Sequence, residues 1–473
     1  MDKTIPVEAA TPHIEGTFLG QPKGVAFLAM TEAWERFSFY GMRGLLVLYM
    51  VQDLLLDPAR VERIAGMSAY RSWLEGLLGP MSTQAFASQT FGLYAGFVYF
   101  TPLFGGLIAD RWLGAKKTVM IGIVLMTAGH FAMVFDWSFL IALLLLVLGS
   151  GCLKGNVAAQ VGHLYGPDEE ERRTRGYVIF STGINIGATL GPLVCGLVAQ
   201  LWGWHLGFGT AGVMMLVAAV VYFAGWNHLA DDSPARRREA AAAAPPVGAA
   251  EWRLLGLVVV VLMLSLFQFL AYDQTSNAGA LWIADRVDLA TPLGPIPVPW
   301  FFSEDSLASI VIVPFLIGLW AWQGRRGGEP HDTAKMATGA VVMGLSVLSL
   351  ALGDWIAGAA GKASLLFPLI AYFLSGVAFM FSWPTMLALV SRRAPAGVNA
   401  MMMAAVYLTA FVTGVGSGWV ARFYETMPGW QFWGLHAALC FAGAVLLWVL
   451  GPVLRRRMDR LERDVAVSSA PAG

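Results

Sequence analysis

The chain has 473 residues, 57% hydrophobic and only 13% charged, a composition typical of a protein with many membrane spans and not of a soluble domain. Its 31 basic and 31 acidic residues balance, which excludes the basic footprint of a nucleic-acid-binding protein. The three cysteines, Cys152, Cys195 and Cys440, lie in apolar segments without metal-ligand spacing, so we expect buried hydrophobic side chains and neither a metal site nor a cofactor.

Apolar segments long enough to cross a bilayer recur along the whole chain, six before a break and six after it. They lie at about 25–51, 89–109, 117–136, 138–163, 176–200, 205–225, 254–285, 300–323, 335–356, 364–390, 398–421 and 430–454. The break is rich in alanine, proline and charge, as in a solvated linker. We therefore predict an all-α membrane protein with twelve spans in two six-helix bundles. Its expected parts are a tail (1–24), a first bundle (25–226), a linker (227–252), a second bundle (253–454) and a C-terminal tail (455–473).

Basic residues near the span ends predict the orientation, because cytoplasmic loops carry an excess of lysine and arginine. With the N-terminus inside, the cytoplasmic loops receive Arg111, Lys116, Lys117, Arg172, Arg173, Arg175, Arg236 to Arg238, Arg325, Arg326, Lys335, Arg392 and Arg393. The opposite loops hold few, except that the loop after the first span carries Arg60, Arg63 and Arg71. We expect both termini in the cytoplasm and no signal peptide, since residues 1–23 are polar and the first apolar run is long.

The first span carries charges where lipid-facing residues are expected. Glu32, Arg36 and Arg43 fall on one helical stripe with Tyr40, and Glu35 lies at its edge. Each charge costs roughly 2.5–3.5 kcal/mol at the centre of a membrane helix, so four of them are expected to face a polar interior. Two interpretations remain, an ion-pair cluster between packed helices and a polar pathway through the membrane, and the second is favoured.

The second span ends in a glycine-rich and charged segment, Gly105 to Lys117. Its glycines allow close helix approach, and Asp110 with Arg111 and Lys117 can join neighbouring helix ends at the cytoplasmic face. We expect a structural staple here and no contact with substrate.

The fourth and fifth spans each contain one polar residue among small ones. Lys154 lies near mid-membrane by residue count and needs a carboxylate, for which Glu32 or Glu35 is the obvious source. The side chain of Asn185 could equally form a hydrogen bond between helices or form one with the substrate.

The seventh and eighth spans add three acids. Asp273 lies at a depth similar to Arg43, so we expect the two to pair and to form a gate on the outer side. Glu304 and Asp305 enter the membrane at the mouth of the eighth span, where acids are usually solvated.

The segment Glu32 to Arg43, EAWERFSFYGMR, matches the signature ExxERFxYYGMR of the proton-dependent oligopeptide transporters, a family of the major facilitator superfamily. The resemblance covers essentially all twelve spans, and on it the chain is identified as a member of that family. It recurs at Tyr99, Asp110, Lys154, Asn185, Asp273, Gln274, Trp300, Phe301, Lys335, Gly339 and Pro384.

The resemblance implies a fold of two six-helix bundles with alternating access to a central site. It implies that Glu32, Glu35, Arg36 and Lys154 couple transport to protons, and that Arg36 and Lys154 hold the substrate carboxylate. Tyr40 and Tyr99 would line the pocket, and Asn185 would form a hydrogen bond with the peptide backbone. Arg43 and Asp273 would form a gate, and Asp110, Arg111 and Lys117 a cytoplasmic latch.

Several positions depart from the family on the substrate side. Phe379 stands where the family carries the glutamate that meets the peptide's ammonium group, and Asp305 stands where it carries an asparagine. Ser181 and Phe39 stand where the family carries tyrosines, and Phe269 stands where it carries a tryptophan. Either Asp305 holds the ammonium instead, or Asp305 is solvated while Phe379 packs against an apolar end of the substrate.

The sequence thus predicts a proton-coupled symporter that imports di- and tripeptides or peptide-like carboxylates across a bacterial inner membrane and works as a monomer, its partners being protons, substrate and the lipid bilayer. The alternatives are a transporter of a carboxylate without a free amine and a sensor or scaffold that does not transport. We do not expect an enzyme, because the seven histidines are scattered without a catalytic constellation.

Overall fold

The computed structural model describes residues 17–166, 168–230, 248–393 and 399–469. A short antiparallel pair, β1 (Thr17–Phe18) and β2 (Gln21–Pro22), precedes the first helix. The helices of the first half are α1 (Lys23–Gln52), α2 (Pro58–Arg63), α3 (Met67–Leu78), α4 (Thr83–Phe100), α5 (Pro102–Ile108), η2 (Ala109–Leu113), α6 (Ala115–Ala132), α7 (Phe139–Leu153), α8 (Asn156–His163), α9 (Glu170–Trp202) and α10 (Trp204–Ala224). Those of the second half are α12 (Ala249–Ser276), α13 (Ala278–Arg286), α14 (Trp300–Arg326), α15 (Asp332–Ala357), α16 (Leu366–Arg393), α17 (Asn399–Ala421) and α18 (Gly429–Ser469).

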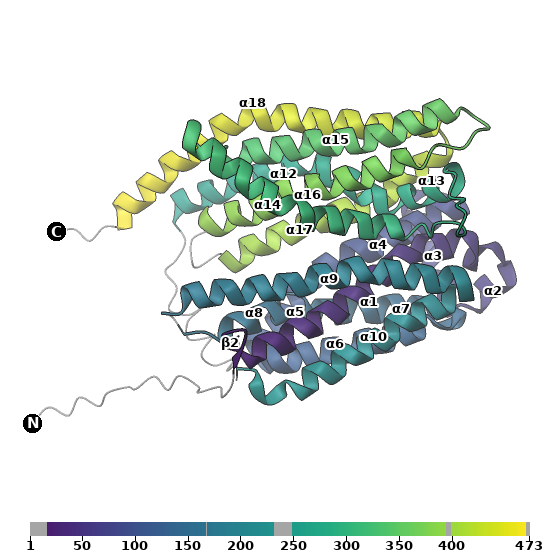
Figure 1. Cartoon of the computed structure of the whole chain (residues 1–473), viewed down its shortest axis with the longest axis horizontal. Helices are drawn as coiled ribbons and strands as arrows, with labels where there is room; N and C mark the ends of the chain where they lie inside the picture. Colours follow the sequence, from purple (N-terminus) through teal and green to yellow (C-terminus); the bar gives the residue numbers. More distant parts are fainter. Residues whose placement is uncertain (1–16, 167, 231–247, 394–398, 470–473) are drawn as a thin grey trace, which may run out of the picture.

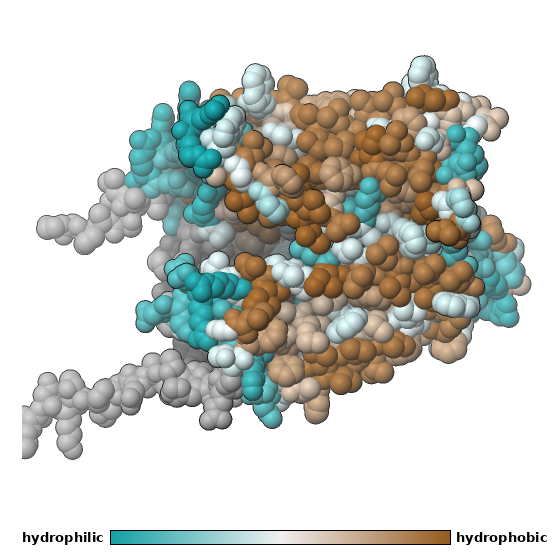
Figure 2. Space-filling model, viewed as in Figure 1, coloured by the Kyte–Doolittle hydropathy of each residue, from teal (hydrophilic) through white to brown (hydrophobic). Residues whose placement is uncertain are grey.

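Twelve helical spans confirm the predicted count. Eleven stretches of the described chain are long and apolar enough to cross a membrane. The twelfth is α6, whose 18 residues suffice for a crossing, although Lys116, Lys117 and His130 lower its mean hydropathy. The space-filling view shows a broad apolar band with hydrophilic residues gathered at its two ends, as a bilayer requires (Figure 2).

The helices form two bundles, α1 to α10 and α12 to α18, which lie side by side (Figure 1). Both β2 and the end of α18 lie at one end of the molecule, called the terminal end below, and α2, α3 and α13 lie at the other, called the loop end. Residues 231–247 of the expected linker, including Arg236 to Arg238, lie outside the described residues.

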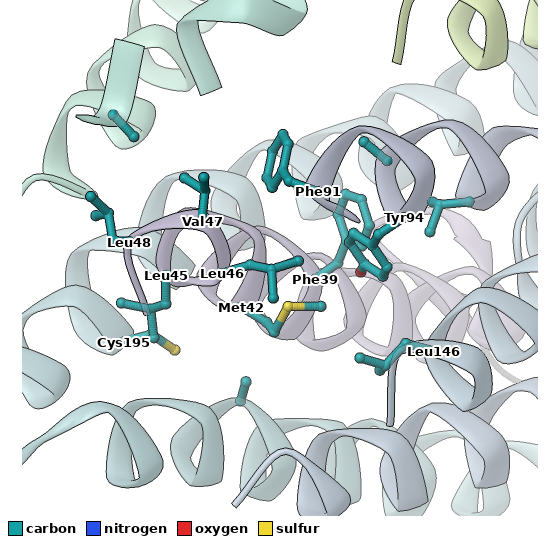
Figure 3. Close-up of a cluster of buried hydrophobic side chains, with 14 of the residues drawn as sticks. Phe39, Met42, Leu45, Leu46, Val47, Leu48, Phe91, Tyr94, Leu146 and Cys195 are labelled. Carbon is teal, nitrogen blue, oxygen red and sulfur yellow. The ribbon is translucent and has the colours of Figure 1, made fainter. Parts of the chain in front are cut away.

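Helix α1 runs through the middle of the first bundle and is buried on nearly every side. Its contact with α9 depends on glycines, because a Cβ at Gly187 would lie 2.0 Å from the carbonyl oxygen of Ala33, and one at Gly41 would lie 2.6 Å from Sγ of Cys195. Apolar residues of α1, such as Met42 and Leu46, fill the space toward α4 and α7 (Figure 3). The charged residues of α1 are thus fixed on a tightly packed helix.

The observed helices differ from the predicted spans at several places. Residues 52–89 contain α2 and α3, and the second span begins at Thr83, where Ser82 accepts a hydrogen bond from the backbone N–H of Ala85 as an N-cap. The seventh span divides into α12 and α13, and α18 continues past residue 454 to Ser469.

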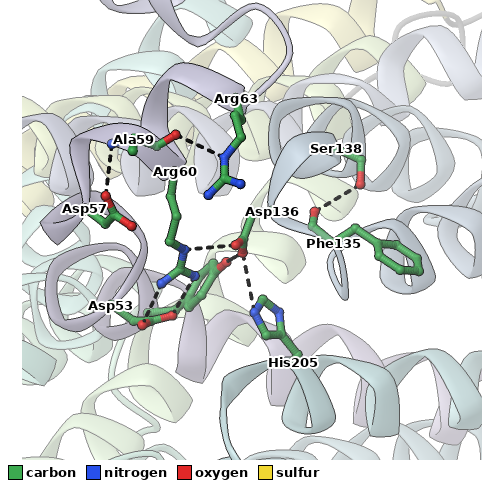
Figure 4. A network of polar contacts seen from close by, with 10 residues as sticks. Asp53, Asp57, Ala59, Arg60, Arg63, Phe135, Asp136, Ser138 and His205 are labelled. Atoms are coloured by element: carbon green, nitrogen blue, oxygen red, sulfur yellow. Dashed lines mark hydrogen bonds and ion pairs between the residues drawn. The ribbon is translucent and has the colours of Figure 1, made fainter.

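A polar network ties the loop after the first span to the bundle (Figure 4). Arg60 donates to both carboxylate oxygens of Asp53, at 2.9 and 3.0 Å, and its Nε lies 2.9 Å from Asp136. Tyr49 donates to Asp136 at 2.6 Å, and His205 lies 3.4 Å from the same carboxylate. Arg60 is therefore a structural, neutralised cation, which explains why a basic residue occurs on the side where few were expected.

Candidate functional site between the bundles

The charged stripe of α1 forms one compact cluster. Nε of Arg36 lies 2.8 Å from a carboxylate oxygen of Glu32 and 2.7 Å from one of Glu35. All three side chains are buried, and Glu35 is 0% exposed. One guanidinium therefore faces two carboxylates inside the membrane, so a further positive charge, either a proton or a cation, is needed to balance the cluster.

Lys154 lies where the fourth span breaks between α7 and α8. The break is set by Gly155, whose φ of +80° suits glycine and interrupts the helix. The lysine Nζ lies 4.1 Å from the ring of Phe39 and 4.4 Å from that of Tyr99, which are cation–π contacts.

The expected ion pair of this lysine differs in the structure. Among the described residues, no carboxylate oxygen lies within 4.0 Å of Nζ of Lys154, because Arg36 holds both Glu32 and Glu35 in this conformation. The lysine is nonetheless buried, with 7% of the residue exposed. A buried ammonium without a hydrogen-bond acceptor is poised to receive an anion.

Arg43 and Asp273, which the sequence predicted to meet, lie 3.3 Å apart between Nη2 and Oδ1. The pair joins α1 of the first bundle to α12 of the second. Thr413 of α17 donates to the other carboxylate oxygen at 2.7 Å, so Asp273 has partners from two sides. Nε of Arg43 is buried and has no hydrogen-bond partner among the described residues.

Further contacts close the interface on the loop-end side of this pair. Asn277 donates to the carbonyl oxygen of Ser88 at 3.1 Å, and Gln84 donates to that of Ala421 at 3.3 Å. Trp300 donates across the bundles to the carbonyl oxygen of Leu193 at 3.0 Å. The structure therefore shows the conformation in which the loop end is closed.

A small cavity of about 30 Å³ lies beside the Arg43–Asp273 pair. Its walls come from both bundles and consist of Tyr40, Arg43, Gly44, Tyr272, Thr275, Ser276, Phe302, Asp305, Ser306 and Tyr372. The carboxylate of Asp305 accepts hydrogen bonds from Tyr272, at 2.9 Å, and from Ser375. Asp305 is thus partly buried and lines an internal cavity together with Tyr40. Tyr99, which the resemblance assigns to the same pocket as Tyr40, does not line this cavity.

Phe379 lies in a row of aromatic rings that joins the two bundles. Its ring stacks on Tyr272 at 5.2 Å and on Trp383 at 5.8 Å between centroids. Tyr99 of the first bundle lies 6.4 Å from Trp383 and 6.3 Å from Tyr407. This row, from Tyr272 to Tyr99, leads from Asp305 to Lys154. The sequence analysis missed Tyr272, Trp383 and Tyr407, because an aromatic residue in a span is most often ordinary core packing.

Asn185 lies on α9 between Gly183 and Gly187, which both pack against α1; a Cβ at Gly187 would come within 2.9 Å of Cβ of Arg36. The side chain is partly buried, and no hydrogen bond joins its amide to another described residue. Asn185 therefore forms no hydrogen bond between the described helices in this conformation, and its amide is available to a ligand.

The predicted latch residues lie at the terminal end. Asp110 and Arg111 belong to the π-helical turn η2, and Lys117 lies in the first turn of α6. Gly114 has a φ of +76° and makes the sharp turn between these two elements possible. All three charged side chains are exposed.

Comparison with known proteins agrees with this geometry. The family model described as Major Facilitator Superfamily matches residues 36–418. The chain belongs to the major facilitator superfamily.

Within the superfamily, it is a member of the oligopeptide transporter family. A curated di-/tripeptide transporter of Lactococcus lactis subsp. lactis (strain IL1403) is 29% identical over 510 residues, covering 94% of this chain and 98% of the relative. A crystal structure of a peptide transporter of this family in complex with sulfate is 27% identical, with a TM-score of 0.79 and coverage of 94% and 97%. A mutant peptide transporter solved in complex with alafosfalin is 26% identical, with the same TM-score and coverage. The likeness extends over nearly the whole transporter fold in each case.

Proposed function

We propose that the protein is a proton-coupled symporter that imports di- and tripeptides or peptide-like carboxylates by alternating access. The terminal end faces the cytoplasm of a bacterial-type cell, and the loop end faces outward. The curated relatives supply the substrate class, since they are named di-/tripeptide transporters. The twelve spans supply the membrane pathway.

The observation that carries this proposal is the buried cluster of Glu32, Glu35 and Arg36 with Lys154 nearby. In this conformation Arg36 is occupied by two glutamates and Lys154 by none. A substrate carboxylate therefore binds Lys154 first and then competes with the glutamates for Arg36. The glutamate displaced from the guanidinium loses its counter-ion in a buried site, which favours its protonation.

Proton binding and substrate binding thus strengthen each other, which is the thermodynamic link that symport requires. Each proton that moves inward contributes about 2.3 kcal/mol for every 100 mV of membrane potential. Tyr40 and Tyr99 line the route, and Asn185 offers its amide to the peptide backbone. The Arg43–Asp273 pair serves as the outer gate, and Asp110, Arg111 and Lys117 as the cytoplasmic latch.

One observation favours a second candidate, a transporter of carboxylates without a free amine. Phe379, at the position where the family's ammonium-binding acid is expected, is stacked between two other rings. A non-transporting sensor has no such support, because it has no need for four buried charges that are costly to place in a membrane.

Proteoliposomes test the proposal. The purified protein should accumulate labelled dialanine against its gradient when the outside is made more acidic than the lumen. Replacing Glu35 by Gln should abolish this accumulation and spare exchange of labelled for unlabelled dialanine, because exchange needs no net proton movement. Accumulation by Glu32→Gln and Glu35→Gln at the wild-type level would show that the proton assignment is wrong.

A further inference from the structure

The carboxylate of Asp305 has neutral hydrogen-bond partners only. It accepts from the hydroxyls of Tyr272 and Ser375, and among the described residues no lysine, arginine or histidine nitrogen lies within 4.0 Å of it. An ionised carboxylate has acceptor sites for about four hydrogen bonds, so roughly half of them remain open. Within a membrane span, such a negative charge is unfavourable unless a cation pairs with it.

The backbone at Asp305 is held rigidly against α16. A Cβ at Gly376 would lie 2.2 Å from the carbonyl oxygen of Asp305, so only glycine allows this approach. Ser309 donates to the carbonyl oxygen of Gly376 at 3.0 Å and fastens the same two helices. Ser375, the residue before this glycine, is thereby placed to donate to the carboxylate. The close packing of α14 on α16 therefore fixes the position of Asp305 at the cavity.

The cavity in front of Asp305 has the size and charge for a small cation. Its volume of about 30 Å³ suits a group as large as a water molecule or an ammonium. Tyr40 and Ser306 add hydroxyl groups to the wall. The charge of Arg43 is countered by Asp273 outside the cavity, at 3.3 Å. One uncompensated negative charge therefore remains, that of Asp305.

The two ends of the aromatic row carry opposite charges. At one end Lys154 lies 4.4 Å from the ring of Tyr99, and at the other Tyr272 donates to Asp305. A molecule lying along the row meets a cation at one end and an anion at the other. This arrangement is complementary to a zwitterion, not to a simple carboxylate.

We propose that Asp305 is the binding site for the ammonium group of the substrate, which deepens the proposed function and rests on it. The substrate carboxylate lies toward Lys154 and Arg36, and its ammonium enters the cavity at Asp305. Phe379 supports this site indirectly, since its ring stacks on Tyr272 and so orients the hydroxyl that holds Asp305. The free amine is thus recognised by Asp305 on α14, and not by a residue at the position of Phe379 on α16.

Paired ligands test the assignment on the full-length protein in detergent. Affinities are measured for dialanine and for N-acetyl-dialanine, which differ only in the charged amine. An amine held by a partly buried carboxylate is a charge-assisted contact, so Asp305→Asn should weaken dialanine by about ten- to a hundredfold and N-acetyl-dialanine by less than about threefold. Asp305→Glu should retain most of the preference for dialanine. Glu304→Gln, a change at the neighbouring acid, is the matched control and should leave both affinities unchanged.

A second variant covers the case in which Asp305→Asn does not fold. Ser306→Met keeps Asp305 but fills the cavity, and it should cause the same selective loss of dialanine. Equal affinities of the wild type for the two ligands, or equal losses for both in Asp305→Asn and Ser306→Met, would overturn the assignment. If Asp305→Asn instead abolishes proton-driven accumulation of both ligands while leaving their affinities intact, Asp305 carries a proton and not the amine. A wild type that neither binds nor accumulates either ligand would overturn the proposed function itself, and that result is visible without any variant.

Discussion

The side chain of Arg36 holds both glutamates of α1 through its Nε side: Nε donates a hydrogen bond to Glu32 at 2.8 Å and makes an ion pair with Glu35 at 2.7 Å. The ammonium of Lys154 is a compact point charge, and it rests on the rings of Phe39 and Tyr99. Two buried cations therefore differ in role within one site. Arg36 pairs with two protein carboxylates in this conformation, whereas Lys154 pairs with none of those described, so in the proposed mechanism Lys154 is the cation that a substrate anion meets first.

The Arg43–Asp273 pair allows a residue-scale test by charge reversal. Removing one partner leaves the other charge buried and unpaired, a loss of about 3–5 kcal/mol for the closed conformation. Arg43→Asp alone should therefore abolish most dialanine uptake by proteoliposomes. Adding Asp273→Arg should restore part of it, because the pair is rebuilt in the opposite direction.

The double-mutant cycle decides whether the contact matters for transport. The uptake rates of the two single variants, the double variant and the wild type give a coupling energy. A coupling near zero would contradict the role of the pair as a gate, whatever the effect of each single change. Thr413→Val is a useful control, since it removes only the supporting hydrogen bond to Asp273.

At the residue scale, the sequence predicts an isolated ion pair better than it predicts the partner of a charge that has several opposite charges nearby. Arg43 and Asp273 were expected to meet because each is the natural opposite charge at its depth. The partner of Lys154 was expected to be a glutamate, yet Arg36 competes for the same carboxylates and holds them in this conformation. Sequence spacing gives no measure of that competition.

Glycines set how closely α4 and α17 approach across the bundle interface. A Cβ at Gly92 would lie 2.6 Å from the carbonyl oxygen of Gly414, and one at Gly418 would lie 2.9 Å from that of Ser88. The two helices thus pack backbone to backbone near the loop end. This contact and the Arg43–Asp273 pair belong to the same closed conformation.

Replacing Gly92 by Leu should prevent closure of the loop end while leaving each bundle folded. Spin labels at Ser72→Cys and Leu293→Cys, two exposed positions at the loop end of different bundles, should report a longer mean distance in this variant. Dialanine uptake should fall by at least about tenfold, the change expected when the closed state loses about 1.4 kcal/mol.

The matched control is Gly318→Leu on α14, since no atom lies within 4 Å of the position of its Cβ. That variant should show wild-type distances and uptake. An unchanged distance in Gly92→Leu, with normal uptake, would mean that the α4–α17 contact does not limit closure.

Helix breaks were the part of each element that the sequence predicted least well. The break at Gly155 places Lys154 at the site, but the chain has 53 glycines, and most of those in spans serve close packing. Glycine allows a positive φ but does not require one, so the sequence does not show which glycine interrupts a helix. The spans themselves were predicted well, because a long apolar run has few alternatives in a membrane protein.

For the whole molecule, the two-bundle architecture follows from the division of apolar runs into six and six. The resemblance extends that prediction to the fold, and the family comparison confirms it. The relative orientation of the two bundles could not be predicted from the sequence, because it depends on which conformation the protein adopts. The structure shows the one closed at the loop end.

Orientation in the membrane is the remaining whole-molecule prediction, and α14 provides the sharpest test of it. The loop before this helix, residues 287–299, contains one charged residue, Asp288, whereas the helix ends at the other side with Arg325 and Arg326. Because positive residues are retained in the cytoplasm, the loop end should face outward.

Two exposed positions on either side of α14 separate the two orientations. Leu293→Cys should react with a membrane-impermeant maleimide in intact cells, and Gly327→Cys should react only after the cells are permeabilised. The parent protein is the control, since Cys195 and Cys440 are buried and Cys152 is partly buried. The opposite labelling pattern would place the terminal end outside and would contradict the proposed orientation. Labelling of both positions in intact cells would mean that α14 does not cross the membrane, a result that only a different fold could accommodate.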